Sequence, residues 1–444
     1  MTRFLRVFKH LVTRTGACVA CRAAARDANR WRCVTFGPSF GAAIDKEGAV
    51  YVWGQVEEGT FVEPLPLAAG GIVDCRCSAT DLYMLGGNGN VCVLRDVKSA
   101  LHNISANTTS KLPSVSGDSG NGSTTGTSSH DSGTVAQTQQ AGEQTVEKTP
   151  LPAPERIEGL AGKRIVKISV GNDHAAFLAD DGSLYCCGDN SFGQCGKKPL
   201  NVRNDYSLMV FQYSVVNPVE HIDLHKVRFK DPATSVVDVV CGGRHTCCVD
   251  SDGNVYTFGD DASVQLFLGD TRGRTLLELE HYKPYRARNG ESNHSCTKYT
   301  QTDLHLQFNP IPVNQVGKLR ECQYLMRGAA TTLAAGDDFS IVAATPEEQG
   351  DRVTHLIASG GNRYGQCASA DFRMHRPRVT RLSGVLLPRS FGCGSRHCMA
   401  ALDNGQIVGW GSNQHRQLDP NSELTCNYDN NVQNAVFLCP QLRF

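Results

Sequence analysis

Short apolar runs, separated by polar or glycine-containing junctions, recur along most of the chain. In the clearest stretch, Val236–Cys241 is followed by apolar runs at 246–249 and 255–258, each too short for a typical globular helix. The second and third runs meet at Asp252-Gly253, a junction typical of tight hairpins because glycine readily adopts positive φ. The pattern predicts an antiparallel meander of short strands.

The same meander recurs with a fixed template. A glycine is followed three places on by His or an aromatic residue, eight places later by a second glycine, and then by a hydrophobic residue and a third glycine. The clearest copies place these structural positions at Gly171, His174, Gly182 and Gly188; at Gly242, His245, Gly253 and Gly259; and at Gly394, His397, Gly405 and Gly411. Two further copies begin at Gly37 and Gly336, and a more divergent sixth copy spans 72–95. Self-similarity at this period indicates a repeat architecture.

Each copy continues into a polar loop, such as 189–196, and then into a proline-led stretch that we expect to form a fourth strand. These stretches are 217–219, 309–311 and 376–379. Four short strands per repeat predict an all-β fold, a β-propeller of four-stranded blades. We expect the ring to be closed by the N- and C-terminal strands, which together would complete one blade.

The repeats resemble the regulator of chromosome condensation repeat family. The features that carry the resemblance occur together and in order: the G-x-x-H turn, the Asp-Gly hairpin, the aromatic-x-x-G strand end and a following loop such as Gly193-Gln194-Cys195-Gly196. The resemblance covers about residues 33–444 outside the insertions and implies a seven-bladed propeller, although six repeats are visible. Trp-Asp dipeptides, which mark WD40 blades, are absent from the sequence.

The resemblance implies two classes of function. Mitochondrial members of the family are associated with ribosome assembly and RNA metabolism, which implies a scaffold for macromolecular partners. The founding member promotes nucleotide exchange on a Ran-type small GTPase through acidic and histidine residues in the turns. Asp173, Asp337 and Asp338 match acidic turn positions, whereas Arg244 and Arg396 place positive charge in the corresponding turns. These five residues are candidates for partner binding.

Composition and the absence of known motifs argue against several other classes of function. Lys+Arg and Asp+Glu number 44 each, so the net charge of zero argues against a strong sequence-independent grip on nucleic acid. The 19 cysteines fall mostly where the repeat needs small apolar residues, and no second ligand pair at zinc spacing accompanies Cys18 and Cys21. No nucleophile elbow, P-loop or zinc-protease motif is present. We therefore expect no enzyme activity, no cofactor and no metal, and no apolar run is long enough to span a membrane.

The first 32 residues form a separate segment. Residues 1–26 contain six basic residues and no Asp or Glu, and apolar residues from Phe4 to Val12 recur at helical spacing. Arg-rich, acid-poor amphipathy is typical of a mitochondrial transit peptide. We expect a mitochondrial location. The alternative is a nuclear or cytoplasmic location, if this segment is only a basic terminal helix or a tail that contacts nucleic acid.

Three stretches interrupt the predicted propeller of 33–444. The Ser/Thr/Gly-rich stretch 99–155 lacks aromatic residues and is expected to be a disordered loop. The insertions 197–232 and 267–326 are richer in apolar and aromatic residues. The second insertion carries a basic patch at Arg272, Arg274, Arg286 and Arg288 beside two tyrosines, Tyr282 and Tyr285. Such a patch either contacts RNA directly or is a solvated loop. The expected partners are therefore proteins, a ribonucleoprotein or a small GTPase.

Overall fold

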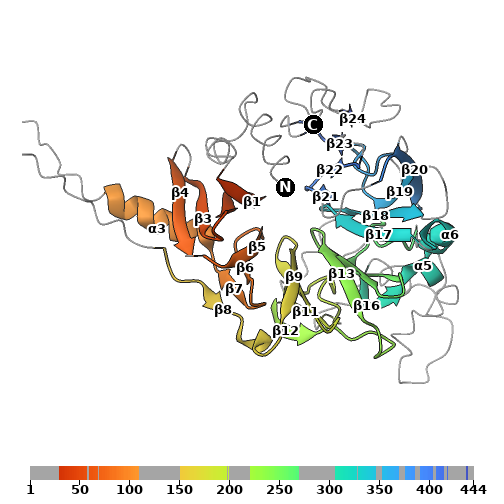
Figure 1. Ribbon diagram of the computed structural model, residues 1–444, viewed down its shortest axis with the longest axis horizontal. Helices are drawn as coiled ribbons and strands as arrows, with labels where there is room; N and C mark the ends of the chain where they lie inside the picture. The colour runs from red at the N-terminus through yellow and green to blue at the C-terminus, as the bar shows by residue number, and fades with distance from the viewer. Residues whose placement is uncertain are drawn as a thin grey trace, which may run out of the picture.

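The computed structural model is a propeller in which six four-stranded antiparallel sheets stand around a common axis (Figure 1). The first strands of the sheets lie toward the axis and the fourth strands lie outside. The described residues are 30–57, 60–68, 70–109, 151–197, 199, 221–269, 306–327, 329–346, 353–369, 376–385, 391–403, 407–414, 418 and 437–438. The all-β propeller predicted from the repeats is confirmed, and a seventh blade is not among the described residues.

Each blade takes its strands from one continuous stretch of chain. The first blade contains β1 (Trp31–Phe36), β2 (Phe40–Asp45), β3 (Val50–Glu57) and β4 (Thr60–Ala68). The second contains β5 (Ile72–Cys77), β6 (Leu82–Gly86), β7 (Val91–Leu94) and β8 (Glu155–Arg156). The third contains β9 (Ile165–Val170), β10 (His174–Ala179), β11 (Leu184–Asp189) and β12 (His221–Lys226), and the short helix η1 (Glu158–Leu160) precedes it.

The other three blades follow the same order. The fourth contains β13 (Val236–Cys241), β14 (His245–Asp250), β15 (Val255–Asp260) and β16 (Leu306–Pro312). The fifth contains β17 (Ala329–Ala335), β18 (Phe339–Pro346), β19 (Val353–Gly360) and β20 (Arg378–Ser383). The sixth contains β21 (Gly392–Cys393), β22 (His397–Ala401), β23 (Ile407–Gly411) and β24 (Phe437–Leu438). The expectation that the terminal strands share one blade is wrong, because β1 and β24 each complete a different sheet.

The predicted strand boundaries hold best where the template is clear. The three apolar runs of the fourth blade lie within β13, β14 and β15, and their hairpin turns at Gly253 with φ +77°. The divergent copy at 72–95 supplies β5, β6 and β7, so it is a blade. In the third blade the fourth strand is β12, where Ile222 and Leu224 alternate with polar residues, whereas the stretch 217–219 expected to form it lies outside the described residues.

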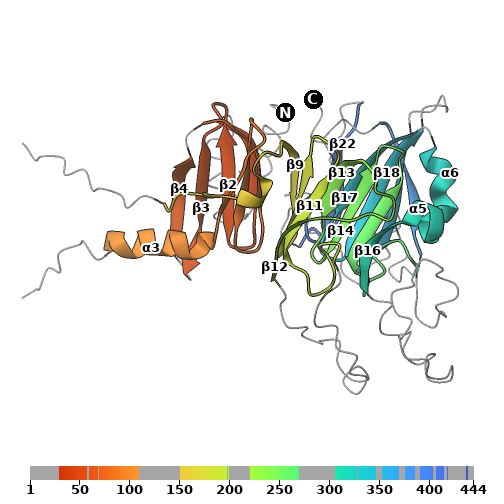
Figure 2. The ribbon, with the colours of Figure 1, turned by 90° about the horizontal axis from the view of Figure 1, so that it is seen from below.

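The structure differs from the sequence prediction at the beginning of the stretch 99–155. Helix α3 (Val97–Thr109) occupies its first part, and a backbone N–H at Ser99 donates to the Asp96 carboxylate at 3.2 Å as an N-cap. Val97 and Leu101 are buried in the cluster that joins the first two blades. Figure 2 shows α3 beside the first blade. Their helical spacing is the signal that the low aromatic content of the stretch obscured.

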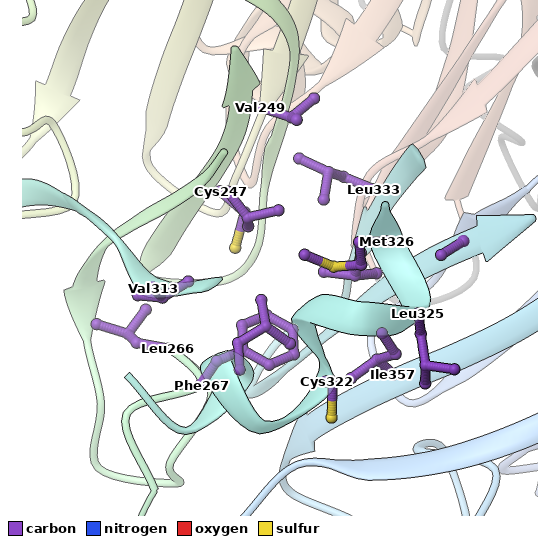
Figure 3. Close-up of a cluster of buried hydrophobic side chains, with 14 of the residues drawn as sticks. Cys247, Val249, Leu266, Phe267, Val313, Cys322, Leu325, Met326, Leu333 and Ile357 are labelled. Carbon is purple, nitrogen blue, oxygen red and sulfur yellow. The ribbon is translucent and has the colours of Figure 1, made fainter. Parts of the chain in front are cut away.

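The hydrophobic core consists of clusters between neighbouring blades. Five such clusters join successive sheets, because alternate residues of each strand face one neighbour or the other. The cluster between the fourth and fifth blades also takes in three short helices outside the strands: α5 (Val313–Val316), η4 (Lys318–Cys322) and α6 (Gln323–Met326). Figure 3 shows Phe267 and Met326 in this cluster. The stretch 267–326, predicted to be an insertion, therefore contributes both a blade strand and core residues.

Candidate functional site

The G-x-x-H turns lie at the end of each blade at which the third strand ends and the fourth strand begins. In an antiparallel four-stranded blade, the connection from the first to the second strand and that from the third to the fourth lie at the same end of the sheet. The third-to-fourth connections include 95–154, 190–220, 261–305 and 412–436. We call the face that carries the G-x-x-H turns the turn face. The Asp-Gly hairpins lie on the opposite face.

Backbone hydrogen bonds link the turns of five successive blades. The N–H of Ala79 donates to the Asn172 carbonyl at 2.7 Å, and that of Asn172 donates to the Gly243 carbonyl at 3.2 Å. The N–H of Gly243 donates to Gly336 at 3.1 Å, and that of Asp337 donates to Ser395 at 3.1 Å. The turns therefore form a continuous arc whose backbone positions are fixed by their neighbours.

The first template glycine provides space for the ring three residues later. A Cβ at Gly171 would overlap the ring of His174, and a Cβ at Gly242 would overlap that of His245 and the carbonyl oxygen of Gly336. In the fifth blade the Phe339 ring fills the same space. This steric pairing explains why the glycine and the ring occur together in the template.

Two of the template histidines also connect neighbouring blades. His174 Nε2 lies 3.0 Å from the Thr246 hydroxyl oxygen, which itself donates to the Gln194 carbonyl at 2.8 Å. Because the hydroxyl proton is directed to Gln194, His174 Nε2 must carry the proton that it donates to Thr246. His245 Nε2 lies 2.8 Å from the Ser340 hydroxyl of the next blade. These contacts agree with the structural role that the sequence predicts for the histidines.

Burial keeps the template histidines neutral. Desolvation lowers the pKa of His174 to about 4, that of His245 to about 3 and that of His397 to about 4. His174 and His245 are 1% and 0% exposed. Neither ring is therefore able to contact a partner or exchange protons with solvent at neutral pH.

The lowered histidine pKa values predict acid-sensitive stability. An unfolded histidine titrates near pH 6.5, so between about pH 6.5 and 4 the unfolded chain binds protons that the folded chain rejects. Each buried histidine then costs about 1.4 kcal/mol of unfolding free energy per pH unit. We expect the urea midpoint to fall from pH 7 to pH 5. The His245→Phe variant, which copies the fifth blade, should be less stable at pH 7 but show a shallower pH slope; equal slopes would contradict the assignment.

The polar loops after the third strands have one repeated hydrogen-bond frame. In the third blade Asn190 Oδ1 accepts from the Cys195 N–H at 3.1 Å, and Gln194 Oε1 accepts from the Phe192 N–H at 2.8 Å. In the fifth blade Asn362 and Gln366 make the same bonds to Cys367 and Tyr364, each at 2.8 Å. The Asn and Gln of the loop are therefore structural. The residue two places after the Asn is Phe192 in the third blade and Tyr364 in the fifth.

This aromatic residue of the loop contacts an arginine from the next blade. The Arg244 guanidinium lies over the Phe192 ring, 4.8 Å from its centroid, and Arg396 lies 5.1 Å from the centroid of Tyr364. Arg396 Nη1 also donates to the Tyr364 hydroxyl at 3.0 Å. Cation–π contacts of this kind hold a long side chain in place while leaving its charge available. Both arginines are exposed on the turn face.

Acidic residues occupy the same turn position in the alternate blades. Asp173 and Asp338 are the third residues of their turns, as Arg244 and Arg396 are in the next blades, so the charge alternates along the arc. Burial and the nearby Asp337 raise the pKa of Asp338, whereas Gln366 and Arg396 lower it. Burial, followed by the nearby Asp189, raises the pKa of Asp173. The structure thus brings all five predicted turn residues, Asp337 included, onto one face.

Other predicted residues cannot be placed in the same way. Arg272, Arg274, Arg286 and Arg288 lie outside the described residues, as does Gly405. Conversely, sequence reasoning did not single out Phe192 and Tyr364, although both stand two places after Asn in the repeated loop. Among the described residues there is no group of three or more His, Cys, Asp or Glu that could hold a metal ion, and no described helix is long and apolar enough to cross a membrane.

Comparison with known families supports the repeat assignment. The model described as "Regulator of chromosome condensation (RCC1) repeat" matches residues 165–194, 236–263 and 389–417, and a second model of that description matches 181–249. Regulator of chromosome condensation repeats are present within residues 165–263 and 389–417. The matched residues fall in the third, fourth and sixth blades, where the glycine template is most complete. The resemblance inferred from the template is confirmed.

The curated proteins that this chain resembles have different names. The "RCC1-like G exchanging factor-like protein" of Mus musculus is 24% identical over 299 residues, which cover 61% of this chain and 58% of the relative. "Protein FMP25, mitochondrial" of Saccharomyces cerevisiae is 22% identical over 275 residues, covering 58% of this chain and 40% of the relative. The chain thus spans about half the length of the curated relatives that it matches.

Similar solved structures include one yeast protein and one human protein. Yeast RCC1 (Prp20) bound to Kap60 has a TM-score of 0.48 and 15% identity, covering 88% of this chain and 72% of that one. Human WBSCR16 has a TM-score of 0.44 and 18% identity, covering 79% of this chain and 64% of that one.

Proposed function

We propose that the protein is a non-enzymatic scaffold whose turn face binds a macromolecular partner. The observation that carries this proposal is the alternation of charge along the hydrogen-bonded arc of turns, with Arg244 and Arg396 held over aromatic rings. Charged side chains in fixed positions favour a partner with a matching charge pattern. A protein or ribonucleoprotein surface fits such a pattern, and the repeated Asn/Gln loops provide a rigid support.

Site-specific photocrosslinking tests which face binds. A photoreactive amino acid at position 364 lies on the turn face beside Arg396. The control position, Tyr324, is 70% exposed on α6, in the connection from β16 to β17. In cells that express the full chain, position 364 should crosslink a discrete partner that position 324 does not capture. Crosslinks to the same partner from position 324 alone would contradict the proposal.

We propose that the scaffold acts in mitochondria. The Arg-rich, acid-poor composition of residues 1–32 and the name of the yeast relative, "Protein FMP25, mitochondrial", support this location. A role in ribosome assembly or RNA metabolism would follow from the resemblance to mitochondrial members of the family. We expect a fluorescent protein fused to residues 1–32 to enter mitochondria, and a matched fusion with the six basic residues of 1–26 changed to Gln to remain outside. A nuclear or diffuse signal for the first fusion would contradict this location.

Nucleotide exchange on a small GTPase is the second candidate function. It is supported by the acidic turn residue Asp173, which is exposed, and by the name of the mouse relative. Burial of His174 and His245 removes them from contact with a partner, so exchange would depend on the charged turn residues. If this function is present, the purified chain accelerates nucleotide release from a GTPase and Asp173→Ala abolishes the acceleration. Lack of acceleration across a panel of small GTPases would exclude it and leave the scaffold.

A further inference from the structure

Two cysteines face each other across the turn of the sixth blade. Cys393 on β21 and Cys398 on β22 are direct partners in the antiparallel register, and their Sγ atoms lie 2.8 Å apart. The four residues between them form the G-x-x-H turn Gly394-Ser395-Arg396-His397. The turn that carries Arg396 is therefore flanked by two thiols in contact.

The register of the hairpin suits a bond between these thiols. The N–H of Gly394 donates to the His397 carbonyl at 2.8 Å, so 394 and 397 are a hydrogen-bonded pair. The next pair outward, Cys393 and Cys398, is then a non-hydrogen-bonded pair, in which the Cα atoms approach to about 4.5 Å. This separation falls within the range spanned by disulfides.

Other blades lack a second sulfur at this register. The corresponding pairs in the third, fourth and fifth blades are Val170–Ala175, Cys241–Thr246 and Ala335–Ser340. In the fourth blade the Thr246 hydroxyl donates to the Gln194 carbonyl at 2.8 Å, and in the sixth blade Cys398 Sγ lies 3.6 Å from the equivalent Gln366 carbonyl. Among these blades the sixth alone has replaced both positions with thiols.

We propose that Cys393 and Cys398 are a reversible oxidation site that closes a disulfide across the Arg396 turn. The oxidant is a small-molecule disulfide such as oxidised glutathione. The Cys393 thiolate attacks one glutathione sulfur, which forms a mixed disulfide and releases one glutathione thiolate. The Cys398 sulfur then attacks the Cys393 sulfur, and the departing second glutathione takes up the Cys398 proton. Two protein thiols are oxidised and one glutathione disulfide is reduced to two thiols.

The order of these steps follows from burial. Cys398 is 0% exposed, and burial and the neighbouring Cys393 raise its pKa well above the ordinary value, whereas Cys393 is half-buried. The thiolate is the attacking species, so the more exposed Cys393 meets the oxidant first. Closing the bond ties together the two strands that carry Arg396, whose side chain contacts Tyr364 of the preceding blade.

Peptide mapping of the full-length protein tests the site. The native protein is equilibrated in glutathione buffers of increasing oxidation and then denatured in the presence of an alkylating agent, so that buried free thiols also react, and the chain is digested with trypsin. Because cleavage follows Arg389, Arg396 and Arg416, Cys393 and Cys398 fall on separate peptides, 390–396 and 397–416. We expect these peptides to become disulfide-linked in oxidising buffer and to separate after reduction. Cys241, whose register partner is Thr246, is the internal control and should remain alkylated.

A variant distinguishes Cys393, which reacts first with the oxidant, from Cys398, which closes the disulfide. Cys398→Ser replaces the thiol with a hydroxyl, the group that Thr246 places at the same register in the fourth blade, so the change in packing is small. In this variant oxidation should stop at a glutathione adduct on Cys393. The proposal is overturned if both cysteines of the wild-type protein remain alkylated in oxidising buffer, or if Cys393 is recovered linked to Cys367 or only to glutathione.

Discussion

Gly242→Ala should abolish the folded state or lower the unfolding free energy by about 3 kcal/mol or more. The added Cβ would overlap both the His245 ring and the carbonyl oxygen of Gly336, which belongs to the next blade. Overpacking of a rigid site usually costs about 1–3 kcal/mol, and here one obstacle is backbone that is already hydrogen-bonded to Gly243. Urea denaturation followed by circular dichroism would measure the loss.

Two control variants locate the cause of this effect. Among the described residues, apart from its two chain neighbours, none has an atom within 4 Å of a Cβ added at Gly392 on β21, so Gly392→Ala should change the unfolding free energy by less than about 0.5 kcal/mol. Combining Gly242→Ala with His245→Ala removes one of the two overlaps but leaves the Gly336 carbonyl, so the double variant should remain destabilised. A Gly242→Ala protein as stable as the wild type would show that the ring and glycine are not sterically coupled.

Replacing both turn-face arginines should have the largest effect on partner binding. Arg244 and Arg396 present exposed charges held over aromatic rings, and well-placed arginines are among the residues that dominate interface energetics. The Arg244→Glu, Arg396→Glu double variant should weaken affinity by about 30-fold or more, which corresponds to at least about 2 kcal/mol. The fold should persist, because neither side chain is buried. Isothermal titration with the purified partner measures the change.

The aromatic supports should matter less than the charges that they hold. Phe192→Ala and Tyr364→Ala leave both guanidinium groups present but free to move. An exposed cation–π contact contributes about 0.5–1 kcal/mol, so each variant should weaken binding only about two- to fivefold.

Much of the fold follows from local signals. The Asp-Gly hairpins and the glycine–ring spacing depend on contacts between residues close in sequence, so the template placed the first three strands of the blades correctly. Helix α3 was missed because the prediction for 99–155 rested on composition. Val97 and Leu101 have helical spacing, but the stretch as a whole is polar and lacks aromatic residues. The fourth strands were harder. The predicted stretch 309–311 lies within β16, but β12 begins after the connection 190–220 and was not predicted at 221–226.

The candidate site was only partly predictable, because some of its contacts join residues that are distant in the sequence. The charged turn residues could be read from the template because they occupy the variable places within it. The contacts of Arg244 with Phe192 and of Arg396 with Tyr364 join different blades, and their sequence separation depends on the length of each connection. Likewise, Cys393 and Cys398 resemble other small core residues until the strand register brings their sulfur atoms together.

The most direct test of the turn face is a comparison of two matched double variants against the same purified partner. Arg244→Glu with Arg396→Glu reverses two charges on the turn face, and Lys163→Glu with Arg228→Glu reverses two exposed charges on the connections of the opposite face. Isothermal titration should show a loss of about 30-fold or more for the first pair and an affinity within about twofold of wild type for the second. The reverse pattern, or equal losses, would contradict binding through the turn face.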